Sequence, residues 1–149
     1  PWIASREQGG FIRETFPHYL QLTHHLLGDL NILAHGTTYP ENTELCETGV
    51  SALAKTTSGI PVVINGLAGI GQEERIDYKI FGSEKVVTLR NWSQVYTSKA
   101  YEPEVEVPAN TAPESMLDAC RKVLLGEEAF IVPFEEGLKV QRWIDELLK

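Results

Sequence analysis

The segment GGFIRETFPHYLQLTHHLLG, residues 9–28, predicts one helix ahead of a region of strands. Apolar residues recur in it at helical spacing, at Ile12, Phe16, Tyr19, Leu22, Leu26 and Leu27. Gly28 suits a left-handed cap at the C-terminal end of this helix. Because Pro17 lacks a backbone N–H, the helix must either begin near this residue or kink there.

Strand patterns follow from residue 31 to about residue 99. Ile76, Tyr78 and Ile80 alternate with polar residues, which indicates a sheet with one solvated face. The runs 60–64, 85–90 and 94–97 are also typical of strands. The connections between these runs are too short for crossover helices, so the sheet should be antiparallel. We therefore predict a single α+β domain over residues 1–149.

The C-terminal third of the chain returns to helical patterns. Thr111 and Glu114 have the spacing of a capping box and predict a helix start. The predicted helix carries an apolar stripe that places Cys120 in the core. A short strand over 129–132 is expected next. A last helix should begin after Pro133 and bury one face, made by Val140, Trp143, Ile144 and Leu147.

Composition excludes several classes of protein. The 149 residues are 42% hydrophobic, too many for a disordered chain, and contain no run long enough to span a membrane. A formal net charge of −8 argues against a nucleic-acid partner. The cysteines, Cys46 and Cys120, have no metal-ligand spacing and are not expected to form a disulfide. No signal peptide is visible, so we expect a cytoplasmic protein.

Candidate chemistry concentrates on the first helix. If that helix is continuous through Pro17, Glu14, His18, Gln21 and His25 fall within about 60° of one another. Composition alone favours a solvated face with i,i+4 pairs. A catalytic or ligand-binding stripe, or a metal site on Glu14, His18 and His25, are the alternatives.

Glycines 66, 69 and 71 do not make a dinucleotide fingerprint. Such a fingerprint follows a strand and opens a helix, whereas residues 72–75 lead into another alternating strand. We therefore interpret these glycines as turn or bulge positions.

The order of motifs resembles the C-terminal part of the Gfo/Idh/MocA family of glucose–fructose oxidoreductases and inositol dehydrogenases. Within residues 9–28, His18 matches the family's His, and Glu14 stands where the family has Asp. Gln21 replaces a second Asp, and Phe16 replaces a Gly. Residues 47–48, 58–71, 82–89 and 126–138 resemble later family segments in the same order.

The resemblance implies a substrate-binding and oligomerisation domain. Its fold would be a largely antiparallel open sheet with helices packed on one face, the other face pairing between subunits in a homo-oligomer. The family's N-terminal Rossmann domain, which holds NAD or NADP and a Glu-Lys-Pro motif, would lie outside this chain. No cofactor is therefore expected here, and no metal is expected either, because further Cys, His or Asp at ligand spacing are lacking.

The resemblance also implies roles for four residues. His18 would take the hydroxyl proton of a sugar-like or polyol-like substrate while hydride passes to NAD(P), with Glu14 orienting the imidazole or binding the hydroxyl. Gln21, which keeps hydrogen bonding in place of an Asp, would bind the small-molecule substrate. Arg13 is a candidate for an anionic group of that substrate, with an ordinary surface Arg as the alternative. Alone, such a domain should be inactive. The alternative is a stand-alone ligand-binding or dimerisation module without catalytic activity.

Overall fold

The computed structural model describes residues 2–109 and 114–149, which fall into two compact units. The first unit is Pro1–Ile70 together with Val132–Lys149, and the second is Gly71–Ile131. The chain therefore leaves the first unit after residue 70 and returns to it at residue 132.

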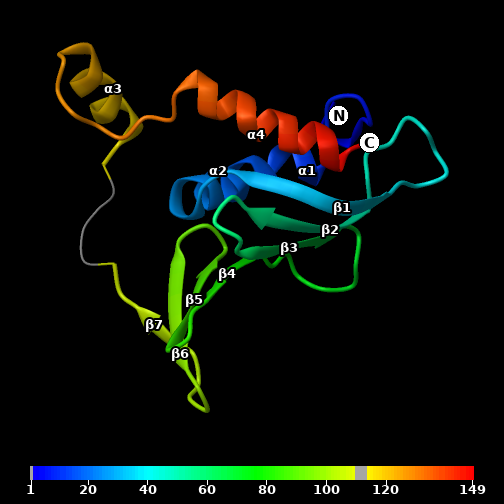
Figure 1. Ribbon diagram of the computed structural model, residues 1–149. Coiled ribbons are helices and arrows are strands. Elements are labelled where there is room, and N and C mark those ends of the chain that lie inside the picture. The colour runs from blue at the N-terminus through cyan, green and yellow to red at the C-terminus, as the bar shows by residue number, and fades with distance from the viewer. Residues whose placement is uncertain (1, 110–113) are drawn as a thin grey trace. The chain divides into compact units, whose positions relative to one another are not determined.

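The first unit contains an antiparallel three-stranded sheet in the order β1-β2-β3. These strands are Leu30–Thr38, Gly49–Thr56 and Pro61–Leu67. A register shift lies between Ile32 and Ala34. The 3-10 helix η1 (Trp2–Ala4) and the helices α1 (Phe11–Glu14), α2 (Phe16–Leu27) and α4 (Phe134–Leu147) complete the unit. Figure 1 shows α1, α2 and α4 on one side of this sheet.

The core of the first unit lies between these helices and the inner face of the sheet. Strand β2 alternates between buried and exposed positions, as expected for a sheet with one covered face. The core consists of nine apolar side chains, Ile12, Leu20, Leu30, Val50, Ala52, Ala54, Val140, Ile144 and Leu147. The predicted buried face of the last helix is confirmed by Val140, Ile144 and Leu147.

The predicted first helix is divided in two. α1 ends at Glu14, and α2 starts at Phe16 with Pro17 in its first turn, where a missing backbone N–H costs nothing. The buried face of α2 centres on Leu20 and Thr23, whereas Leu26 is exposed. Gly28 ends α2 with φ 90° and ψ −171°, outside the left-handed helical region expected for it.

The second unit contains an antiparallel four-stranded sheet in the order β4-β5-β6-β7. These strands are Asp77–Phe81, Lys85–Arg90, Gln94–Lys99 and Val105–Val107, and the helix α3 is Met116–Leu124. The prediction of a strand over 85–90 matches β5. The two antiparallel sheets with helices confirm the α+β class.

Three predictions in the second unit fare differently. Residues 129–132 do not form a strand, because no strand of the described chain pairs with them. Cys120 is exposed rather than in the core, because α3 buries Ala119 and turns its apolar stripe outward. The Thr111 cap lies outside the described residues; the N-cap of α3 is Ser115, whose Oγ accepts a hydrogen bond from the Asp118 N–H.

Candidate functional site

The four predicted site residues do not share one helix. Glu14 ends α1, while His18 and Gln21 lie on α2 beyond the break at Thr15. Glu14 and His18 are exposed, and Gln21 is half-buried. The continuous stripe of carboxylate, imidazole and amide therefore splits into an exposed part and a part that faces α4.

Gln21 is tied to α4. Its Nε2 donates a hydrogen bond of 2.6 Å to Glu136 Oε2 in the first turn of α4. Its Oε1 is buried and has no hydrogen-bond partner among the described residues. One of the two amide N–H groups is thus used inside the protein.

His24, which the predicted stripe did not include, lies in a polar cluster between α2 and α4. Its Nδ1 lies 3.0 Å from Asp29 Oδ1 without forming a hydrogen bond, and its Nε2 lies 4.0 Å from Glu136 Oε2. Lys139 Nζ lies 3.0 Å from the same Asp29 oxygen. The His24 ring packs against Trp143 with centroids 5.8 Å apart. This cluster holds the two helices together around Gln21.

Sequence reasoning could not have found the α2–α4 cluster from spacing. Gln21 and Glu136 are 115 positions apart, and Asp29 and Lys139 are 110 apart. The one available signal was that His24 lies three residues after Gln21, on the same side of a helix.

Arg13 lies beside the N-terminal segment. Its Nη1 donates to the Arg6 carbonyl oxygen at 3.4 Å, and the Arg6 guanidinium stacks 3.8 Å from the Tyr39 ring centroid. Burial, and then the charge of Glu47, raise the pKa of Tyr39, while Arg6 and Arg13 oppose that shift. Among the described residues, no carboxylate forms an ion pair with Arg13, so its charge is available to an anionic group.

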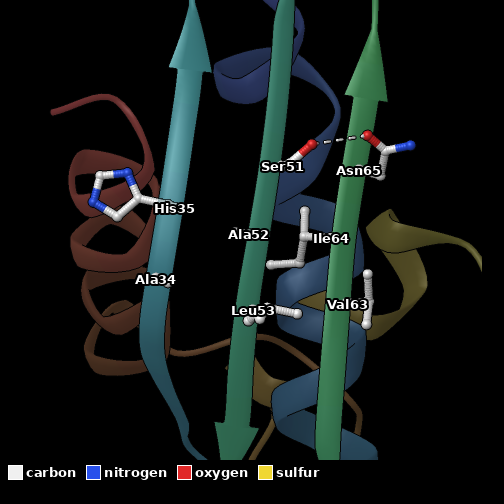
Figure 2. A pocket seen from close by; sticks show the side chains of 8 residues that line it. All are labelled: Ala34, His35, Ser51, Ala52, Leu53, Val63, Ile64 and Asn65. Carbon is white, nitrogen blue, oxygen red and sulfur yellow. Dashed lines mark hydrogen bonds between the residues drawn. The ribbon is translucent and has the colours of Figure 1, made fainter.

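The outer face of the three-stranded sheet is open and largely apolar. A shallow hollow of about 490 Å³ lies over the middle of the three strands, where Ala34, Leu53 and Val63 stand opposite one another. Figure 2 shows Ser51 and Asn65 at its polar end, where Ser51 Oγ lies 3.3 Å from Asn65 Oδ1. Leu53 is 54% exposed and Val63 is 75% exposed. This face has no covering element in the first unit as described.

The glycines that resemble a phosphate loop do not fit a dinucleotide. Gly66 lies within β3, where a Cβ would come 2.6 Å from the Phe11 ring, so close packing explains this glycine. Gly69 and Gly71 follow β3 and lead to β4 rather than to a helix. Among the described residues, no three His, Cys, Asp or Glu side chains gather to hold a metal ion. Of the helices that the structure describes, none has the length and apolar character needed to cross a membrane.

Comparison with known proteins identifies the fold. No family model matches the sequence, and no curated protein matches it. Among solved structures, an oxidoreductase from Thermotoga maritima matches with a TM-score of 0.73 at 15% identity, over 100% of this chain and 45% of that one. An oxidoreductase from Agrobacterium radiobacter, solved with NAD+, L-tartaric acid and magnesium, matches with a TM-score of 0.67 at 17% identity, over 99% of this chain and 49% of that one.

A third structure has a stated reaction. KijD10, a 3-ketoreductase from Actinomadura kijaniata solved with NADP and TDP-benzene, matches with a TM-score of 0.66 at 14% identity, over 91% of this chain and 44% of that one. This chain thus spans about half the length of the oxidoreductases that share its fold. The fold expected from the resemblance to Gfo/Idh/MocA oxidoreductases is confirmed.

Proposed function

We propose that this chain is the C-terminal, substrate-binding half of an NAD(P)-dependent oxidoreductase of the Gfo/Idh/MocA type, acting on a sugar-like or polyol-like hydroxyl. The main support for this proposal is that the structural match covers very different shares of the two chains compared. Nearly all of this chain aligns with about half of each oxidoreductase, at TM-scores of 0.67 and 0.73. A chain of this kind supplies the substrate pocket, and a second domain outside it supplies the dinucleotide that exchanges the hydride.

His18 is the group proposed to accept the substrate hydroxyl proton. It is exposed on α2, where a substrate can reach it. An imidazole can both accept and return a proton near neutral pH, which reversible alcohol oxidation requires. Glu14 is exposed at the end of α1 and is proposed to orient the imidazole or bind the hydroxyl.

Arg13 and Gln21 are the proposed substrate contacts. Arg13 would bind an anionic substrate group, since no described carboxylate neutralises it. Gln21 would act through its amide, whose Nε2 has a second N–H beyond the one that donates to Glu136 and whose Oε1 has no hydrogen-bond partner among the described residues. We propose that the dinucleotide is bound mainly by the second domain, so we assign no cofactor-binding residue here.

The test of His18 belongs in the complete natural protein with NAD(P) and a panel of polyols. His18→Ala should lower kcat/KM about 10²-fold or more, the usual effect of losing a general base. His25→Ala is the matched control, because His25 is an exposed imidazole on the same helix. Equal kinetics for the two variants would refute the role of His18.

The outer face of the three-stranded sheet is proposed to pair with a second copy of the chain. Leu33, Leu53, Val63 and Leu67 are more than half exposed on this sheet, and contiguous apolar patches of this kind mark interaction sites. Val63→Glu should convert an oligomer to a monomer in sedimentation, while Arg142→Glu, an exposed change on α4, should not. A wild-type protein that sediments as a monomer would remove this part of the proposal.

The stand-alone module is the second candidate, and the match of nearly all of the chain to about half of each oxidoreductase is compatible with both. An immunoblot of fractionated source cells separates the two. A band near 16.6 kDa would favour a binding or dimerisation module. A cytoplasmic band larger by one domain of roughly 100–150 residues would favour the oxidoreductase.

A further inference from the structure

Glu47 is a buried carboxylate with no role in the proposed chemistry. It lies two residues before the start of β2 at Gly49, and only 2% of its surface is exposed. Burying a carboxylate is costly unless hydrogen bonds or opposite charges compensate. A buried Glu at this point therefore requires a structural explanation.

The carboxylate of Glu47 caps the first turn of α1. Its Oε1 accepts a hydrogen bond of 2.7 Å from the Ile12 N–H. That N–H belongs to the first turn of the helix, where backbone donors have no intrahelical partner. Gly10, the N-cap residue, has no side chain to accept it, so Glu47 performs the capping from 35 positions away.

Gly10 provides the space for this contact. Its φ of +101° is a conformation that side-chain-bearing residues rarely adopt. A Cβ on Gly10 would also collide with both carboxylate oxygens of Glu47. Glycine at this position thus serves two purposes: it allows the backbone turn into α1, and it leaves space for the Glu47 carboxylate.

Neighbouring backbone bonds hold both sides of this contact in place. The Gly10 N–H donates to the Ile3 carbonyl oxygen at 2.9 Å, and the Cys46 N–H donates to the Ala4 carbonyl oxygen at 3.0 Å. The segments before α1 and before β2 are therefore joined to the same N-terminal turn. Glu47 Oε2 has no hydrogen-bond partner among the described residues, so the Ile12 bond is the specific contact of this side chain.

We propose that Glu47 is a positioning residue: seated on Gly10, it fixes the start and direction of α1, and thereby the placement of Arg13 and Glu14. The contact itself stands independently of the reaction. Its consequence for catalysis rests on the proposed function, because only there do Arg13 and Glu14 meet a substrate.

Amide signals test the contact without any ligand. In Glu47→Ala, hydrogen exchange at the Ile12 amide should accelerate at least about tenfold, since a hydrogen bond to a charged acceptor is lost. In Glu47→Gln, which keeps the shape, the Ile12 amide proton should move upfield because a neutral oxygen replaces a charged one. Glu44→Gln, an exposed control on the same loop, should change neither. Unchanged Ile12 signals in both Glu47 variants would overturn the proposal.

Kinetics on the complete natural protein test the consequence. Glu47→Gln should lower kcat/KM about tenfold or more while the melting temperature stays near that of Glu44→Gln, because small displacements of site groups are costly. Altered Ile12 signals with unchanged kinetics would overturn the placement of Arg13 and Glu14. If no variant or wild type oxidises any polyol, the proposed function fails, while the Ile12 signals still decide whether Glu47 fixes α1.

Discussion

The two sheets share the same alternation of apolar and polar residues but are stabilised differently. Three helices cover the inner face of the three-stranded sheet, and nine apolar side chains are buried between the helices and the sheet. In the described part of the four-stranded sheet, Thr88 is the one strand residue that is fully buried, and charged side chains link its strands. Alternation therefore predicts a strand and its two faces, but not what covers either face.

Arg90 is the centre of the charged network on the four-stranded sheet. Its Nε lies 2.8 Å from Asp77 Oδ1 on β4, and its Nη2 lies 2.9 Å from Glu104 Oε2, just before β7. Asp77 stands directly opposite Arg90 in the sheet register, a position that favours opposite charges. The Arg90 guanidinium also packs 4.7 Å from the Tyr96 ring centroid. One side chain thus joins several strands.

The largest expected effect is on the apolar core. Ile144→Ala removes a side chain that is 1% exposed and should lower the free energy of unfolding by about 2–5 kcal/mol. Phe134→Ala on the same helix, at a position 96% exposed, should change it by less than about 0.5 kcal/mol. Urea denaturation measures both. Equal losses in the two variants would show that the core does not stabilise the first unit as described.

Arg90→Met should act on the other sheet, with a smaller effect. Amide protection should fall in β4 and β5 and stay unchanged in β2, because Asp77 and Glu104 both lose their main partner. Added salt should weaken the wild-type four-stranded sheet more than that of the variant. Lys85→Met, an exposed change on the same strand, is the control. Loss of amide protection in β2 would contradict the conclusion that the two sheets are stabilised by different interactions.

Acid should also distinguish the two sheets. The hydrogen bonds from Arg90 lower the pKa of Asp77 and of Glu104 below the ordinary values of 3.8 and 4.5. A carboxyl whose folded pKa is lowered stabilises the fold above its unfolded pKa, and that contribution is lost as the pH falls through the folded value. Amide protection in the four-stranded sheet should therefore decline below about pH 4, ahead of the core amides of β2. Simultaneous loss in both sheets would contradict this.

The smallest effect should follow Lys79→Met. Lys79 Nζ lies 4.0 Å from Asp77 and 3.8 Å from Glu104, longer than either Arg90 contact. Exposed pairs of this kind contribute little, so the change in unfolding free energy should stay within about 0.5 kcal/mol. Urea denaturation beside Arg90→Met checks this. If Lys79→Met lowered the free energy of unfolding more than Arg90→Met, Arg90 would not be the centre of the network.

The sequence predicted those features that depend on local periodicity. The buried residues of α4 and the bounds of β5 follow from spacing. It did not predict the burial of Glu47, because nothing local indicates that a carboxylate will meet a helix start 35 residues away. The predicted burial of the apolar stripe of α3 was wrong for a related reason. A helical stripe shows that an apolar face exists, but it does not show that another element covers that face.

The candidate site was predicted only residue by residue. His18 and Glu14 are accessible, as their proposed roles require, but the break at Thr15 places them on separate helices. The bond from Gln21 to Glu136 depends on the return of the chain after the whole second unit, and periodicity within one helix carries no information about that return.

That return has a consequence for biosynthesis. A ribosome completes the three strands of the first sheet, and then all of residues 71–131, before it makes α4. Until α4 emerges, the inner face of the sheet lacks Val140, Ile144 and Leu147, and its apolar surface stays open to water or to a chaperone. Translation of the second unit therefore delays completion of the core of the first unit. During that time the nascent first unit must avoid aggregation.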